Sequence, residues 1–484
     1  MLSTVAGLLA VVALCALGLR SVLCLNLRWD GFAYHLPYAA VWGGLPIPYE
    51  MNDLVRPSFE AYPVLPELVQ GVLWRLSGSM NGAGAINAIA LAAFLAYAHR
   101  ALGAPFWLVA LVSLSAPLVV IHACSSYVDL FGNAFLAIGV CSCLSLSLAP
   151  DQVRRATVFG APAALAAAAW SKYLLVPIAA VTFVVLVALL LRQPRVAGVR
   201  RSRVAWYSAG MGLVLVAPYV KNLLVFKNPF WPLRLPFVGD WFPYTNDALR
   251  GAIQQRPSAL QSTSQLQLFS RSLFEIDQPT SYPNRLRWII DQGSTVEGFR
   301  TGGFWGVAAA VYLVVVVYML VACHGKRGWA VSVALLGALG LVGLLPQSHE
   351  LRYYLFIPLT GAGSVGMLFP RLERAAPHAA MVVLTLVLGL FVYMVIENRP
   401  YYVVKRVDHV AAARAWGAAE WWPKLERGKT YCAVDMLPIG LLLTGPTLSE
   451  FTIVDRSRPE LCPSGSLIIQ GQLGSDGAYR ERAR

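Results

Sequence analysis

Long apolar segments alternate with short polar ones along most of the chain. A helix that crosses the hydrocarbon core of a membrane needs about 20 mostly apolar residues. Eleven segments approach this length, at roughly 2–25, 80–98, 105–123, 128–148, 157–171, 173–191, 204–220, 303–322, 329–346, 353–369 and 378–396. The pattern predicts an all-α polytopic membrane protein with about 11 transmembrane helices.

Basic residues between these segments predict the orientation, because Lys and Arg concentrate in cytoplasmic loops. With the N-terminus in the cytoplasm, the inner side receives Arg100, Arg154, Arg155, Arg192, Arg195, Arg200, Arg201, Arg203, Lys326, Arg327, Arg371 and Arg374. No basic stretch precedes the first segment, so we interpret it as a retained span and not as a cleaved signal. The outer side then receives loops at about 28–79 and 221–302, and the tail.

The chain is therefore expected to have two parts. Residues 1–396 form a transmembrane domain, and residues 397–484 form a small extracytoplasmic C-terminal region. A helical pattern at about 408–422 and short apolar runs at 431–434 and 466–470 predict an α/β appendage.

Composition excludes several classes of protein. With 57% hydrophobic and 13% charged residues, the chain is too apolar for a soluble domain. The net charge of +14 comes from basic residues in loops that lack interleaved aromatics, so no nucleic acid partner is expected. The eight cysteines show no zinc-binding spacing, and we expect no metal and no other cofactor. Cys432 and Cys462 lie in the polar tail and can form a disulfide if the tail faces an oxidising compartment.

The first outer loop contains the most prominent candidate residue. Asp30 follows the first span directly, at a depth where an unpaired carboxylate is costly and usually has a function. It is either a catalytic acid/base or a solvated helix end. Further along the loop, Leu65, Leu68, Val69, Val72, Leu73 and Leu76 recur at helical spacing, while Glu67, Gln70, Gly71 and Trp74 share another face. This pattern predicts an interfacial helix within a folded platform that holds Asp30 at the membrane surface.

Other polar side chains fall on the same predicted outer side. They are Tyr34, His35, Arg56, Tyr62, Asp129, Lys172, Lys221, His349, Glu350 and Arg352. Asp129 and Lys172 either line a functional cavity or pair with each other in helix packing. If a helix begins near Ser348, His349 and Arg352 share a face and form a cationic corner; alternatively, Glu350 and Arg352 only cap and anchor that helix.

This set suits the chemistry of a sugar carried on a lipid phosphate. Fixed cations stabilise the phosphate anion as it leaves. A single carboxylate is enough to take the proton from an acceptor hydroxyl. A glycosidase, in contrast, needs a second carboxyl group to protonate a poor leaving group.

Several short stretches, in order, resemble the GT-C superfamily of integral-membrane glycosyltransferases. They are Asp30-Gly-Phe-Ala-Tyr-His-Leu-Pro, Tyr62-Pro63, Tyr127-Val-Asp129-Leu, Lys172-Tyr173, Asn228-Pro-Phe-Trp-Pro and His349-Glu350-Leu-Arg352-Tyr353. The resemblance covers about residues 1–396 and is greatest to the bacterial group of protein O-mannosyltransferases and lipid A aminoarabinose transferases. It departs at Gly31, where the protein O-mannosyltransferases have a second acid, and this argues against a protein acceptor.

The resemblance implies an inverting transfer from a polyprenyl-phosphate sugar to an extracytoplasmic acceptor at the bacterial inner membrane. Asp30 is then the general base. Arg352, His349, Lys172 and Arg56 are candidates for binding the donor phosphate. Asp129, Tyr62, Glu350, Tyr34 and His35 are candidates for the acceptor site or its support. The expected partners are the lipid-linked sugar, membrane lipids and an acceptor that the sequence does not identify.

Two other classes compete with this interpretation. A transporter or lipid flippase would use charges such as Asp129 and Lys172 as substrate contacts, but transporters place their polar residues near the middle of the membrane. A purely structural membrane subunit does not explain why isolated charges gather on one side. Because these charges lie at the outer ends of the spans, the enzyme is favoured.

Overall fold

The protein was analysed as a computed structural model. The structure describes residues 2–25, 29–47, 49–53, 55–149, 153–192, 195–196, 198–235, 238–247, 250–251, 253, 261–274, 288, 293–295, 298–300, 306, 310–318, 321, 339–340, 342–345, 347–408, 411, 425–434, 452–473 and 479–483.

The chain folds into two compact units. The helical unit comprises Met1–Leu17, Ile89–Ala123 and Asp129–Tyr402. The loop–tail unit comprises Gly18–Ala88, Cys124–Val128 and Val403–Arg484, so the tail groups with residues of the first outer loop. The predicted division after residue 396 stays a prediction.

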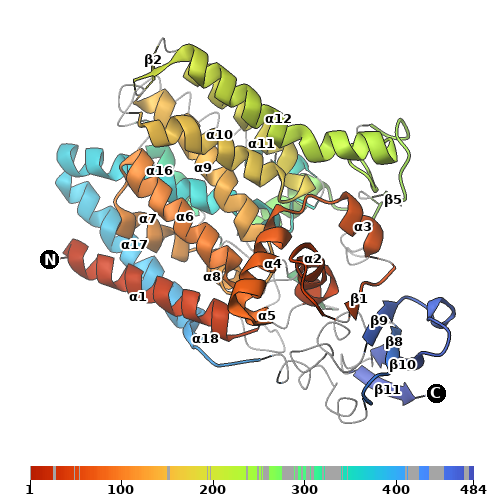
Figure 1. Cartoon of the computed structure of the whole chain (residues 1–484). Coiled ribbons are helices and arrows are strands. Elements are labelled where there is room, and N and C mark those ends of the chain that lie inside the picture. Colours follow the sequence, from red (N-terminus) through yellow and green to blue (C-terminus); the bar gives the residue numbers. More distant parts are fainter. Residues whose placement is uncertain are drawn as a thin grey trace. The chain divides into compact units, whose positions relative to one another are not determined.

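Long apolar helices make up most of the helical unit (Figure 1). Its described helices are part of α1 (Leu2–Leu23) and of α6 (Ala85–Leu102), then α7 (Phe106–Leu114), α8 (Pro117–Ala123), α9 (Asp129–Leu148), α10 (Arg155–Ala169), α11 (Val176–Leu191), α12 (Arg201–Phe226), α14 (Gln265–Phe274), α16 (Phe356–Ala375), α17 (Pro377–Glu397) and α18 (Arg399–Tyr402). Helix α9 packs against α10, α11 and α16. Strand pairs β2 (Arg195–Val196) with β3 (Val199–Arg200), β4 (Leu233–Arg234) with β5 (Asn246–Asp247), and β6 (Gly293–Thr295) with β7 (Gly298–Arg300) are also present.

Seven helices in the described part of the chain are long and apolar enough to cross a membrane. They are Ser3–Leu23, Met80–Leu102, Asp129–Leu148, Tyr173–Leu191, Arg201–Phe226, Leu351–Ala375 and Pro377–Glu397, and each coincides with a predicted span. Helix α10 is apolar but shorter. The predicted spans at about 303–322 and 329–346 are described only in part, so the count of 11 stays a prediction.

One predicted span differs from expectation. Residues 105–123 form two helices, α7 and α8, which meet at an angle of 97°. Pro117 begins the second helix, and because its nitrogen carries no hydrogen it cannot continue the hydrogen-bond ladder of the first. If this bent pair is one span, the described residues hold up to eight.

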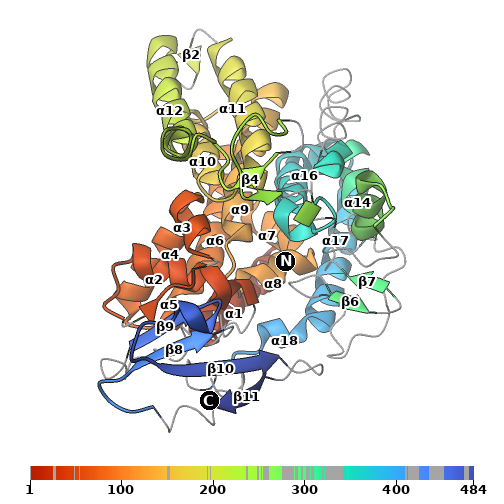
Figure 2. The same cartoon turned by 90° about the vertical axis from the view of Figure 1, so that its right-hand side faces the viewer.

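The loop–tail unit combines short helices with a five-stranded sheet. The helices are α2 (Leu36–Trp42), α3 (Arg56–Ala61), α4 (Leu65–Ser77) and α5 (Met80–Ala83), with a π-helical turn, η1, at Gly31–His35. The sheet has the order β1-β9-β8-β10-β11, from β1 (Tyr49–Glu50), β8 (Thr430–Val434), β9 (Thr452–Arg456), β10 (Leu467–Leu473) and β11 (Tyr479–Ala483) (Figure 2). Pairings are parallel except β10 with β11.

The two apolar runs predicted in the tail are strands β8 and β10, whereas the helix expected at about 408–422 lies almost wholly outside the described residues. Cys432 in β8 and Cys462 are joined by a disulfide bond. Strand β1, in contrast, comes from the first outer loop. The sheet of the appendage is therefore completed by a segment about 400 residues away in sequence, since Tyr49 is in register with Ile453.

Three side-chain contacts accompany this pairing between loop and tail. The Tyr49 hydroxyl donates to Asp455 at 2.6 Å, and Arg456 donates to Glu50 at 2.6 Å. Asp53 accepts from the backbone and hydroxyl of Ser457, at 2.8 and 2.6 Å. The unit also has a shared apolar core of Leu25, Phe32, Leu36, Ala40, Trp74, Met80, Ala83, Tyr431, Ala433, Ile453 and Ile469. The tail thus folds together with the loop that carries Asp30.

Asp455 is an unusual residue in this core. It is fully buried in β9, a strand whose other central positions are apolar. Burial raises the pKa of its carboxyl group to about 8, and this outweighs the opposite effects of the Tyr49 hydrogen bond and the Arg456 charge. Asp455 is therefore largely protonated at neutral pH.

This raised pKa predicts a pH-dependent stability. Between pH 3.8, the ordinary pKa of an aspartate, and about pH 8, the folded protein retains a proton that the unfolded chain releases. The stability contributed by this group is therefore complete below pH 3.8 and is lost as the pH rises through 8. Replacing Asp455 by Asn keeps an acceptor for Tyr49 but removes the titration. Measured by thermal unfolding in detergent, the variant should gain stability over the wild type progressively across this range. Parallel pH profiles for the two proteins would contradict the assignment.

Candidate active site

The predicted site residues fall into both units. Asp30, Tyr34, His35, Arg56 and Tyr62 belong to the loop–tail unit, and Asp129, Lys172, His349, Glu350 and Arg352 belong to the helical unit. Within each unit, several of these predicted site residues lie close to one another.

Asp30 lies at the N-terminal end of η1, and we call residues 30–35 the Asp30 segment. The Leu36 amide donates to the carbonyl of Gly31, the i to i+5 pattern of a π-helix. Such turns are rare and occur frequently at functional sites. The Asp30 amide donates to the hydroxyl of Tyr127 at 3.0 Å, and Tyr127 is fully buried. A buried phenol therefore holds the backbone of a partly exposed aspartate.

Gly31 packs tightly against Ser126. A Cβ atom at position 31 would lie 2.4 Å from the Ser126 hydroxyl oxygen, closer than non-bonded atoms approach. A second acid after Asp30, the feature that this sequence lacks, would therefore require the Ser126 side chain to move.

The helix predicted at 65–76 is α4, and it buries its polar face. Glu67, Gln70 and Trp74 are buried, whereas Leu68, Val72 and Leu76 are 38%, 47% and 80% exposed. A helix with an apolar outer face is stable when that face lies in lipid. This pattern supports the predicted interfacial position.

Glu67 is a residue whose role the sequence did not reveal. Its Oε1 atom lies 2.8 Å from Nδ1 of His35, and the two side chains are only 6% and 3% exposed. The available signal was the single acid of the helix, but its partner is 32 residues earlier and no local pattern identifies it.

Arg56 and Tyr62 flank α3 in the same unit. The Arg56 guanidinium contacts Glu50 at 2.9 Å, with both side chains about half exposed, and Tyr62 ends the helix. Burial acts to raise the pKa of Glu50, but this residue also contacts Arg456, and the two guanidinium groups together lower its pKa. The described contacts of Arg56 are those of an ion pair at the protein surface, and its predicted role in donor binding stays a prediction.

In the helical unit, charged residues gather around Tyr353. The Lys172 ammonium lies 2.5 Å from Asp129 and 4.0 Å from the centre of the Tyr353 ring. The Arg352 guanidinium lies 4.8 Å from the same ring centre, donates to the Tyr353 hydroxyl at 2.9 Å and contacts Glu350 at 3.2 Å. We call these five residues the charged cluster. Two cations thus share one aromatic ring, and each has a carboxylate partner.

The structure differs from the cationic corner predicted for His349 and Arg352. The helix at this point, η5 (Leu351–Tyr354), begins after Glu350, whose backbone has a non-helical ψ of 85°. His349 therefore precedes the helix and does not share a face with Arg352. Its Nδ1 atom lies 3.1 Å from the side-chain amide of Gln265, and it is 1% exposed. Asp129 and Lys172 do pair, and their predicted role in a functional cavity stays a prediction.

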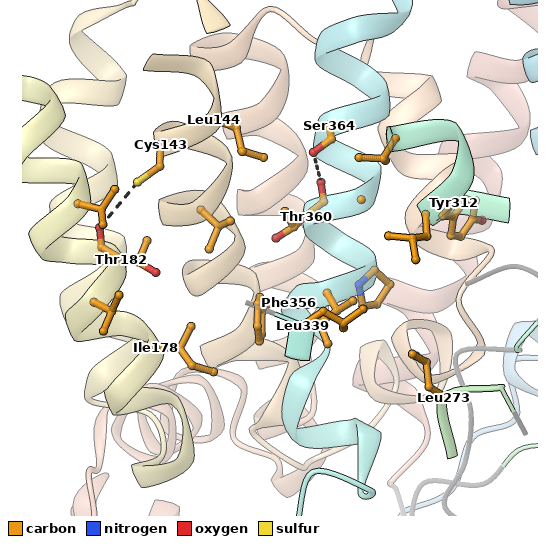
Figure 3. Close-up of a pocket in the computed structure, with 18 of the residues that line it drawn as sticks. Cys143, Leu144, Ile178, Thr182, Leu273, Tyr312, Leu339, Phe356, Thr360 and Ser364 are labelled. Atoms are coloured by element: carbon orange, nitrogen blue, oxygen red, sulfur yellow. Dashed lines mark hydrogen bonds between the residues drawn. The ribbon is translucent and has the colours of Figure 1, made fainter. Parts of the chain in front are cut away.

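An apolar cavity of about 360 Å³ lies in the same unit (Figure 3). Its lining includes Cys143 of α9, Ile178 and Thr182 of α11, and Phe356 and Thr360 of α16. These three helices begin next to the charged cluster, since Asp129 is the first residue of α9, Lys172 precedes α11 and Arg352 precedes α16. Charge therefore lies at one end of the three helices and the apolar cavity further along them.

Asn133 joins these helices between the cluster and the cavity. Its side chain accepts from the Phe356 amide at 2.9 Å and donates to the Asp129 carbonyl at 2.7 Å. Within the described residues, no group of three or more His, Cys, Asp or Glu side chains is arranged to hold a metal ion.

The overall fold agrees with the resemblance to the GT-C superfamily found in the sequence. In particular, the chain is similar to the crystal structure of ArnT, a lipid A aminoarabinose transferase, from Cupriavidus metallidurans in the apo state, with a TM-score of 0.53 and 13% identity. The match covers 94% of this chain and 87% of ArnT. No family model and no curated protein matches the sequence. At this identity the likeness shows a shared fold.

The contact between Gly31 and Ser126 can be tested by a pair of substitutions. Gly31→Ala should destabilise the protein by roughly 1–3 kcal/mol, the usual range for overpacking. Adding Ser126→Ala should recover much of the loss, because the new methyl would then face the Cβ atom of residue 126 at 3.7 Å and a Tyr127 ring carbon at 3.9 Å, both ordinary contact distances. Thermal unfolding of the two variants and of Ser126→Ala alone measures the coupling. Strictly additive effects would show that the two positions do not touch.

Proposed function

We propose that the protein is a glycosyltransferase that moves a sugar from a polyprenyl-phosphate donor to an extracytoplasmic lipid or glycan acceptor. The observation that carries the proposal is the arrangement along α9, α11 and α16, with paired charges at the beginning of the helices and an apolar cavity further along. A lipid phosphate has the matching distribution, with an anionic head and an apolar chain.

In this proposal the donor phosphate binds at Lys172 and Arg352. The Lys172 side chain is 21% exposed and the Arg352 side chain 10%, so Lys172 is the more accessible. A phosphate that approaches the cluster replaces part of the interaction with Asp129 and Glu350, and both cations stabilise the charge that develops as the donor bond breaks. The prenyl chain occupies the apolar cavity, where burial of hydrocarbon provides affinity.

The proposed chemistry is a single inverting displacement. The acceptor oxygen forms a bond to the anomeric carbon while the bond from that carbon to the phosphate oxygen breaks. Asp30 takes the proton of the acceptor hydroxyl, and the polyprenyl phosphate leaves as an anion. The partly exposed position of Asp30 on a rare π-helical turn supports this role.

We further propose that the site faces the periplasm and that the N-terminus is cytoplasmic. The disulfide between Cys432 and Cys462 supports this orientation, because such bonds persist in oxidising compartments. The basic loops predict the same arrangement.

Replacing Asp30 by Asn tests the role of the base. Removing the only proposed proton acceptor should reduce transfer by about a hundredfold or more, the range attributed to general base catalysis, with the protein still folded. The assay follows labelled sugar from lipid-linked donors extracted from the native envelope, and mass analysis of envelope glycans with and without the gene identifies the product. Substantial residual transfer removes Asp30 from this role. Movement of the donor across vesicles with no transfer supports a flippase instead.

Filling the cavity tests the site of the prenyl chain. Gly361 lines the cavity, and a Cβ atom there would have no neighbour within 4 Å, so Gly361→Leu should fold normally. It should weaken binding of undecaprenyl phosphate by about tenfold or more, because the added side chain occupies the volume. Gly389→Leu on α17 is the matched control, since position 389 is equally open and does not line the cavity. Equal affinities in the two variants would place the chain elsewhere.

A further inference from the structure

His35 and Glu67 form a buried hydrogen-bonded pair in the loop–tail unit. Their Nδ1 and Oε1 atoms lie 2.8 Å apart, and both residues are at least nine-tenths buried. In the part of the chain that the structure describes, neither the remaining His35 nitrogen nor the remaining Glu67 oxygen has a hydrogen-bond partner. The pair therefore depends on one contact, and loss of that contact leaves two buried polar groups unsatisfied.

The contact between His35 and Glu67 fixes the C-terminal end of the Asp30 segment. At the N-terminal end, Tyr127 accepts from the Asp30 amide and Ser126 packs against Gly31. At the C-terminal end, His35 contacts Glu67 of α4. Helix α4 is anchored in turn by the hydrogen bond from the Gln70 side chain to the Ser126 carbonyl, at 2.7 Å. The centres of the His35 and Tyr127 rings are 5.9 Å apart, so Tyr127 lies beside both ends.

The π-helical turn is a single turn within the helical stretch 29–42, and turns of this kind are rare and occur frequently at functional sites. The side chains of Tyr127, Ser126 and Glu67 contact it from outside.

We propose that His35 and Glu67 are a positioning pair for Asp30, in which the His35–Glu67 contact holds the π-helical turn and so sets the place of the carboxylate. The inference rests on the proposed function, since Asp30 is its catalytic base. Neither residue of the pair needs to touch the substrate. A displacement of about 1 Å at a reacting group is enough to slow catalysis by about a hundredfold.

Two substitutions at one position provide the test. The amide nitrogen of Asn can occupy the place of Nδ1 in His35, whereas that of Gln occupies the place of Nε2, so His35→Asn preserves the bond to Glu67 and His35→Gln breaks it. We expect His35→Asn to keep kcat within a few-fold of the wild type and His35→Gln to lower kcat by about a hundredfold, with binding of undecaprenyl phosphate unchanged in both. The same two changes at His378, an exposed residue of α17, are the control.

A second measurement does not require transfer. In an Asp30→Cys background, the rate at which the new thiol reacts with a polar maleimide reports the position of residue 30. We expect His35→Asn to leave this rate unchanged and His35→Gln to change it several-fold. Equal labelling rates in the two variants overturn the positioning role, and so do equal values of kcat. If the wild type transfers no sugar, the proposed function fails, and the labelling rates alone decide whether the pair positions residue 30.

Discussion

The structure depends on local neutralisation of charge that is buried beside apolar helices. An isolated ion is costly in a medium of low dielectric, so a buried charge requires a partner of opposite sign or a hydrogen bond. Lys172 with Asp129, Arg352 with Glu350, and His35 with Glu67 each meet this requirement. The pairs also hold the side chains in place, and in the proposed function Lys172 and Arg352 exchange part of this pairing for the donor phosphate.

The charged cluster illustrates this second property. Its two cations lie against the single ring of Tyr353, which restrains them in addition to their carboxylates. Since Lys172 precedes α11, Arg352 precedes α16 and Asp129 begins α9, the positions of three helices determine the distances between charges. The apolar cavity is lined by the same helices, and hence the proposed space for a hydrocarbon chain and the proposed site for its phosphate are parts of one packing arrangement.

In the loop–tail unit, the tail stabilises the loop segment that contains the π-helical turn. A short loop segment has too few contacts to hold a π-helical turn, and the tail supplies the additional core. Phe32 of the turn belongs to the same apolar cluster as Ala433 and Ile453 of the sheet, and Tyr49 and Glu50 of the loop form its edge strand. The disulfide between Cys432 and Cys462 restricts this tail further. The appendage therefore has a structural reason to be part of the protein, since it completes the platform on which Asp30 lies.

The sequence by itself determined seven of the membrane-length helices, the helical nature of residues 65–76 and two of the tail strands, because each depends on the composition and period of a short segment. It also pointed to Asp30, Asp129, Lys172 and Arg352, since isolated charges are conspicuous in an apolar chain. The partners were decided only by the tertiary structure. Lys172 meets Asp129 over 43 residues, and Tyr49 meets Asp455 over 406. No local pattern encodes such contacts, which arise when packed helices and strands bring distant side chains together. The break at Pro117, the π-helical turn and the role of Glu67 belong to the same category, since each is defined by neighbours that are distant in sequence or by the exact path of the backbone.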